Sequence, residues 1–222
     1  MKLSVFRLAL GLTASLAIVS LAGVKDTKHN FTSAASSPNA YFVGTRQVCV
    51  FCHTAHNGNS SFGALWNHED PGPPAYDTYG SNTIDMSITQ PHEGSLVCLS
   101  CHDGTIAVNS LSNLPGPGGA GNYGSPGGSG LDGAGKLTAA SSAYVGTDLN
   151  NDHPVGVLYD ASQDITGFVA KTGVSANYPD KLLWNSLYVE CSSCHNPHDD
   201  TYGNFLVESN ANSNLCTRCH TK

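Results

Sequence analysis

The eight cysteines of this 222-residue chain form four copies of one pattern, two cysteines separated by two residues and followed at once by a histidine. This C-x-x-C-H spacing is typical of c-type haem attachment. Two thiols form thioethers with the vinyl groups of one porphyrin, and the adjacent imidazole binds the iron. We therefore expect four covalent haems, attached through Cys49, Cys52, Cys98, Cys101, Cys191, Cys194, Cys216 and Cys219, with proximal iron ligands His53, His102, His195 and His220.

Three other roles of paired cysteines compete with this interpretation. Such pairs build zinc sites, form disulfide bonds in exported proteins, or act as redox dithiols. None of these roles requires a histidine directly after every second cysteine. The fourfold repetition of the whole pentapeptide therefore favours haem attachment.

The remaining histidines determine how the irons would be coordinated. They are His29, His56, His68, His92, His153 and His198, and Met86 is the only methionine apart from Met1. At least three haems therefore cannot have His/Met ligation, and the supply of imidazoles favours bis-His, low-spin haems of low potential. A six-coordinate iron has no open position for a substrate, which favours electron transfer over catalysis.

Four of these six histidines are the candidate distal ligands. His56 and His198 each follow a proximal histidine by three residues, and on a helical turn this spacing would place both imidazoles on one face. Pro154 holds His153 in an extended loop, and His29 lies in a polar stretch. His68 and His92 are weaker candidates. Each could instead be a solvated surface histidine, and the pairing of imidazoles with irons stays open.

The pattern of apolar residues predicts little regular structure. Gly and Pro account for 24 and 11 residues, and no window sustains helical or alternating spacing. We expect a mostly irregular, coil-rich, haem-organised multihaem cytochrome c fold built around a stacked haem chain. A turn or two of helix is expected at residues 182–184 and 206–207 and a short strand at 188–189, with a Gly/Pro-rich loop at 115–135.

The first 22 residues have the pattern of a secretory signal peptide. Lys2 and Arg7 precede an apolar run that ends in small residues. The alternative, a membrane anchor, is disfavoured because the run is short for a span. Residues 23–222 would then form a single tetrahaem domain of 222 − 22 = 200 residues, in an exported protein that does not span the membrane.

Fifty residues per haem are too few to wrap each porphyrin separately. Because a porphyrin is a large apolar plate, we expect the haems to contact one another and form the core, while the chain is held by thioether and iron–imidazole bonds. Contiguous haems would pass electrons along a row. The net charge of −7 and the charged fraction of 12% argue against nucleic-acid binding.

Several segments together resemble the multihaem cytochromes with paired C-x-x-C-H motifs from metal-reducing bacteria. The resemblance covers about residues 28–220 and rests on residues 28–30, 47–57, 65–67, 98–104, 152–156 and 191–198. It implies bis-His coordination of all four haems, with distal ligands His29, His56, His153 and His198. Some of these relatives polymerise into filaments on the outer cell surface and donate one distal histidine to a neighbouring subunit, which here would be His56.

Three functions are therefore compared. The first is a homopolymer that conducts electrons along a continuous haem chain to extracellular acceptors such as metal oxides. The second is a soluble periplasmic or surface carrier that exchanges electrons with other redox proteins. The third is a multihaem reductase of a small oxyanion, which would need an open iron position and a basic funnel. We rank them in this order.

Overall fold

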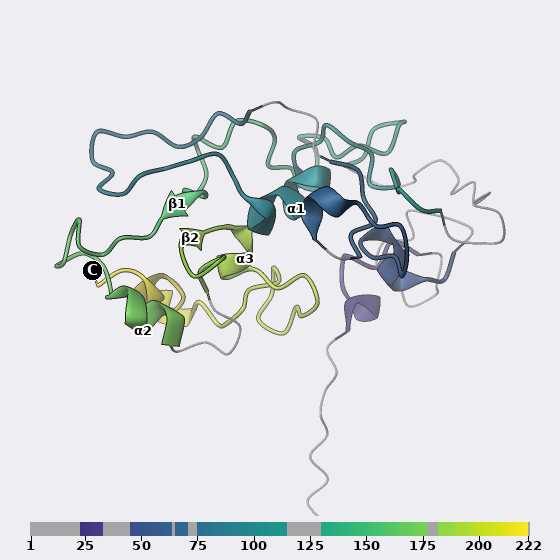
Figure 1. The fold of residues 1–222 in the computed structure, drawn as a ribbon. Coiled ribbons are helices and arrows are strands. Elements are labelled where there is room, and N and C mark those ends of the chain that lie inside the picture. Colours follow the sequence, from purple (N-terminus) through teal and green to yellow (C-terminus); the bar gives the residue numbers. More distant parts are fainter. Residues whose placement is uncertain are drawn as a thin grey trace, which may run out of the picture.

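The structure is a computed structural model that describes residues 23–32, 45–63, 65–70, 75–114, 130–176 and 182–221. The expected signal segment and residues 115–129 of the Gly/Pro-rich loop lie outside these ranges. As predicted, the described chain is mostly turns and irregular segments with few regular elements (Figure 1). No helix within the described ranges is long and apolar enough to cross a membrane.

Regular elements are short. The helices are α1 (Glu93–His102), α2 (Lys171–Ala176) and α3 (Cys191–Cys194), and the strands are β1 (Val157–Leu158) and β2 (Tyr188–Val189). Single 3-10 turns complete the set: η1 (Val24–Asp26), η2 (Val48–Phe51), η3 (Ser60–Phe62), η5 (Ala211–Ser213) and η6 (Cys216–Arg218).

The longest helix, α1, carries the second C-x-x-C-H motif and was not predicted from the sequence. Its buried positions are mainly small residues, Gly94, Ser95 and Ser100, together with Leu99. A Cβ added to Gly94 would lie 2.7 Å from Cδ1 of Trp184. The helix therefore packs through close backbone approach, and its sequence lacks the apolar stripe that identifies an amphipathic helix.

Strands β1 and β2 pair antiparallel, with Val157 opposite Val189 and Leu158 opposite Tyr188. The predicted strand at residues 188–189 is thus confirmed, and it leads directly into α3. The predicted helical turns at 182–184 and 206–207 are wrong. Neither segment is helical, because a residue in each pairs its backbone elsewhere: Trp184 bridges Tyr188, and Leu206 bridges His195.

The described apolar side chains form three small clusters. The first contains Met86, Val157, Tyr159, Val174, Leu182, Leu183 and Val189; the second contains Val50, Phe51 and Val108; the third contains Tyr76, Leu99 and Leu149. The second and third clusters contain only three buried residues each, so they form a small apolar core for the chain segments that surround them. Met86 is 6% exposed and packs within the first cluster.

Candidate haem sites

Each C-x-x-C-H segment forms about one helical turn, and this explains why the spacing matters. The first, third and fourth motifs close the turn with a backbone bond from the histidine N–H to the carbonyl of the first cysteine, with N···O distances of 2.8, 3.0 and 2.9 Å. The second motif forms the last turn of α1. Residues i, i+3 and i+4 of a helical turn share one face. Both thiols and the imidazole can therefore face the same porphyrin.

The thiols of successive motifs lie close together in the order of the sequence. Burial, with smaller contributions from the thiols of Cys101 and Cys49, raises the pKa of Cys52 to about 12. Burial raises the pKa of Cys194 to about 11, and the nearby thiol of Cys219 contributes.

Between these two pairs of neighbouring thiols, the Cys98 thiol hydrogen-bonds to the Cys191 thiol, which raises the pKa of Cys98 and lowers that of Cys191. The attachment motifs therefore form a row from first to fourth. All eight cysteines are free thiols in this structure.

Three pairs of imidazoles lie at the separation that an iron atom between them would require. The ring centres of His53 and His198 are 6.0 Å apart and those of His29 and His102 also 6.0 Å, while His153 and His220 are separated by 6.5 Å. An imidazole nitrogen binds a transition metal at about 2 Å and the ring centre lies about 1 Å further back. Two such rings on opposite sides of one iron have centres about 6 Å apart. The geometry of these residues fits bis-His haem.

Backbone carbonyls orient several of these rings. The Nδ1 of His102 donates to the carbonyl of Ala143 at 2.7 Å, and the Nδ1 of His195 donates to that of Asn204 at 2.8 Å. His153 makes the same bond to Pro154 at 3.1 Å. Such a bond fixes the tautomer and leaves Nε2 as the metal ligand.

Burial also keeps two of the paired imidazoles in the neutral form that binds metal. Burial, followed by the neighbouring ring of His102, lowers the pKa of His29 to about 4. Burial likewise lowers the pKa of His102, and the nearby ring of His195 contributes. The second and third motifs are therefore close neighbours as well.

One proximal histidine has no imidazole partner. Within the described ranges, which include all ten histidines, no ring is paired with that of His195 at this separation. Of the four predicted distal ligands, only His56 is not brought to a proximal histidine. It is exposed, in the loop that follows the first motif.

The two weaker candidates have other contacts. His68 is completely buried, and its two ring nitrogens lie 3.2 Å and 3.0 Å from the carbonyl oxygens of Glu69 and Ala107. His92 lies 2.8 Å from the carboxylate of Glu190. In this structure neither ring faces a proximal histidine.

Neither C-H-x-x-H segment places its two histidines on one helical face. Helix α3 ends at Cys194, and His195 is extended, with φ −121° and ψ 136°. His53 is likewise bridged to Trp66 rather than helical. His198 thus reaches the ring of His53 through a loop and not across a shared helix face.

The sequence analysis missed two side chains that shape these sites. Phe205 stacks on His29 with ring centres 4.2 Å apart and an interplanar angle of 16°. Glu190 caps α3, its carboxylate accepting from the backbone of Ser193. The only signal for Glu190 was its position directly before Cys191, with Ser193 three residues further on, a spacing that permits a reciprocal cap.

A comparison with protein families agrees with this chemistry. The family model described as a doubled CXXCH motif matches residues 188–222, which contain the third and fourth motifs. This motif is the signature of multihaem c-type cytochromes, which carry covalently bound haem c and take part in electron transfer. No curated protein matches the chain.

Proposed function

We propose that the chain is a tetrahaem c-type cytochrome that conducts electrons along a continuous row of bis-His haems. The observation that carries this proposal is the set of three imidazole pairs at 6.0–6.5 Å beside four attachment motifs whose thiols are neighbours in sequence order. Bound haem supplies reversible Fe(III)/Fe(II) cycling. The chain holds the porphyrins in contact, orients the axial imidazoles and excludes substrates from the iron.

The proposal extends to a homopolymer in which His56 of one subunit completes the site of His195 in the next. Within one subunit, the proximal His195 lacks an imidazole partner, while His56 is exposed and has no proximal histidine beside it. One unused ligand and one incomplete site per subunit suit head-to-tail assembly, which continues into a filament if the rotation does not close.

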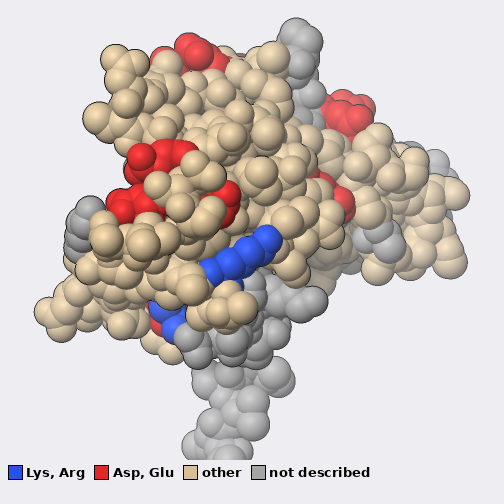
Figure 2. All heavy atoms as spheres, turned by 60° about the vertical axis from the view of Figure 1, so that its left-hand side comes forward, with Lys and Arg blue, Asp and Glu red and all other residues tan. Residues whose placement is uncertain are grey.

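The place of action follows from the expected export. We propose an extracellular filament on the outer cell surface, with other redox proteins as donors and metal oxides as acceptors; the periplasm is the alternative. On the face shown in Figure 2, acidic side chains are scattered widely, whereas basic ones are few and form two small groups, one at the centre and one below it to the left.

The incomplete site at His195 also suits a second function, a reductase with one open iron position. Its substrate would be a small oxyanion such as nitrite. However, the loop after His195 carries Asp199 and Asp200, and the chain has a net charge of −7. This charge repels anions instead of steering them inward, so we place the reductase behind electron transfer.

The test is a His56→Ala variant produced with all four haems. We expect wild-type filaments in electron micrographs of the sheared surface fraction, and only monomers for His56→Ala. Mass spectrometry should find four haems on both proteins, because His56 attaches none. Intact filaments of His56→Ala would reject the donated ligand.

Two further variants make the result specific. Ser60→Ala, in the same loop, should leave filaments unchanged. His198→Ala should instead produce a high-spin haem within each subunit, because it removes the partner of His53. Wild-type monomers with entirely low-spin spectra would favour the soluble carrier, and wild-type filaments with a high-spin haem would favour the reductase.

A further inference from the structure

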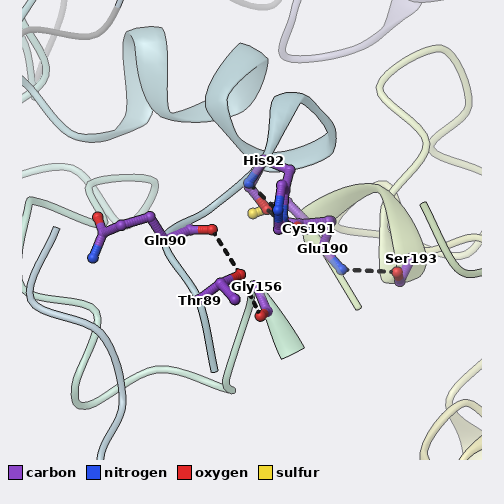
Figure 3. A network of polar contacts seen from close by, with 8 residues as sticks. Thr89, Gln90, His92, Gly156, Glu190, Cys191 and Ser193 are labelled. Atoms are coloured by element: carbon purple, nitrogen blue, oxygen red, sulfur yellow. Dashed lines mark hydrogen bonds and ion pairs between the residues drawn. The ribbon is translucent and has the colours of Figure 1, made fainter. Parts of the chain in front are cut away.

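A buried carboxylate lies where the second and third motifs meet. The side chain of Glu190 is completely inaccessible to solvent. Its Oε1 accepts from Nδ1 of His92 at 2.8 Å and from the backbone N–H of His92 at 3.3 Å, while Oε2 accepts from the hydroxyl of Ser95. The backbone N–H of Ser193 also donates to it, and the backbone N–H of Glu190 donates in return to the Ser193 hydroxyl at 2.9 Å (Figure 3). These donors stabilise an ionised carboxylate.

His92 connects this buried carboxylate to the solvent. Its ring packs against both Trp184 and Tyr188, with ring-centre distances of 5.1 and 4.1 Å. Its side chain is 29% exposed, whereas that of Glu190 is not exposed at all. Since Nδ1 is bonded to Glu190, Nε2 is the nitrogen that can exchange a proton with water. Imidazole is the side chain that ordinarily changes charge between pH 5 and 8.

The pair is joined to two haem-attachment motifs at once. His92 is the N-cap of α1, which contains Cys98 and ends at the proximal ligand His102. Glu190 is the N-cap of α3 and directly precedes Cys191, whose thiol contacts that of Cys98. The second and third haems would therefore both lie near this pair.

Few other titratable groups come from the elements packed around His92. They are Glu93 on α1, whose carboxylate points toward Gly63; Tyr188 on β2; and the thiols of Cys98 on α1 and Cys191 on α3, which become thioethers when haem is attached. Among these groups, the imidazole of His92 is the one that both bonds Glu190 and reaches the solvent.

We propose that His92 and Glu190 form a proton-binding site coupled to the oxidation state of the second and third haems. This inference rests on the proposed electron-transfer function. Reduction of a haem bound at either motif, by one electron from a reductant or a neighbouring haem, would remove one positive charge near this pair. Nε2 of His92 then takes up a proton from water, and Glu190 balances the imidazolium. By linkage, protonation favours reduction to the same extent that reduction favours protonation.

The experiment compares the haem-loaded wild type with His92→Gln by spectroelectrochemical titration between pH 5 and 8. Glutamine can still donate to Glu190 but does not titrate. We expect the midpoint potentials to fall as pH rises in the wild type. In the variant, the pH slope of the most affected haems should be at most about half the wild-type slope. An unchanged slope would overturn the proposal.

The matched control is Glu208→Gln, which removes a carboxylate that pairs with Arg218 at 2.6 Å beside the fourth motif. Neither of those groups contacts His92 or Glu190, so the slope should stay at the wild-type value. If His92→Gln does not fold, proton uptake is measured during dithionite reduction of the wild type in weakly buffered solution, and absence of uptake overturns the proposal. Absence of any haem reduction would instead reject the proposed function itself.

Discussion

The first and third motifs are closed by the same local arrangement, although their sequences differ after the histidine. Thr54 N–H donates to the carbonyl of Leu65, and Asn67 N–H donates to that of Cys52, at 2.8 and 2.9 Å. In the third motif, Asn196 donates to Phe205 and Val207 donates to Cys194, at 2.8 and 3.0 Å. Each C-H-x-x-H segment thus opens a hairpin-like loop that carries its second histidine.

The two loops deliver these histidines differently. The loop at residues 196–205 brings His198 to the ring of His53, with an interplanar angle of 9°. The loop at residues 54–65 leaves His56 exposed. The same local arrangement can therefore supply a ligand within the subunit or present one to a neighbour. The position of the loop along the row of motifs determines which of the two occurs.

The two motifs are also anchored differently. The third begins with α3, capped by the buried carboxylate of Glu190, whereas Gln47 at the start of η2 makes no side-chain cap. The first is held from its far side by Asn67, which is completely buried. Its amide nitrogen donates to the carbonyls of Val50 at 2.7 Å and Asn113 at 2.9 Å. Substitution of Glu190 should therefore destabilise the third motif, and substitution of Asn67 should destabilise the first.

The largest effect is expected from Glu190→Ala. Removing the carboxylate leaves buried donors of Ser95, Ser193 and His92 without an acceptor, and we expect the free energy of unfolding to fall by about 3 kcal/mol. Gln47→Ala, at the N-cap of η2 in the first motif, should change it by no more than about 0.5 kcal/mol. Denaturant unfolding of the haem-loaded proteins by circular dichroism measures both. If both variants lost the same free energy of unfolding, the two motifs would not differ in how their first turns are anchored.

Asn67→Ala should have the next largest effect. It removes two hydrogen bonds to carbonyls and an acceptor for the N–H of Asn113, which lies 2.8 Å from Oδ1. We expect a loss of about 2 kcal/mol, since buried partners remain unsatisfied. Asn196→Ala, whose side chain accepts from the exposed backbone N–H of His198, should lose about 0.5 kcal/mol. The same unfolding measurement compares the two variants. A larger loss for Asn196→Ala than for Asn67→Ala would contradict the role of Asn67 as the anchor of the first motif.

How far the sequence predicts this molecule depends on the range of the contact concerned. The C-x-x-C-H spacing is local, and the coil-rich fold with a strand at 188–189 was predictable because Gly and Pro prevent long elements. The pairing of His53 with His198 joins residues 145 positions apart, and no local pattern encodes it. Helix α1 was missed because small residues such as Gly94 and Ser95 pack it.

The smallest effect separates two residues that occupy equivalent places with the same strained backbone. Leu65 and Phe205 have φ values of 74° and 57°, a region that costs an L residue about 1–2 kcal/mol. Leu65 is 51% exposed, whereas Phe205 stacks on His29. Leu65→Gly should therefore raise the free energy of unfolding of the monomer by about 0.5 kcal/mol, because relief of strain exceeds the added chain entropy. Phe205→Gly gains the same relief but loses the stacked ring and its buried surface, and should lower it by about 1 kcal/mol. Thermal unfolding of both variants gives the sign directly. A shift of the same sign in both would show that the contact of Phe205 with His29 does not distinguish the two loops.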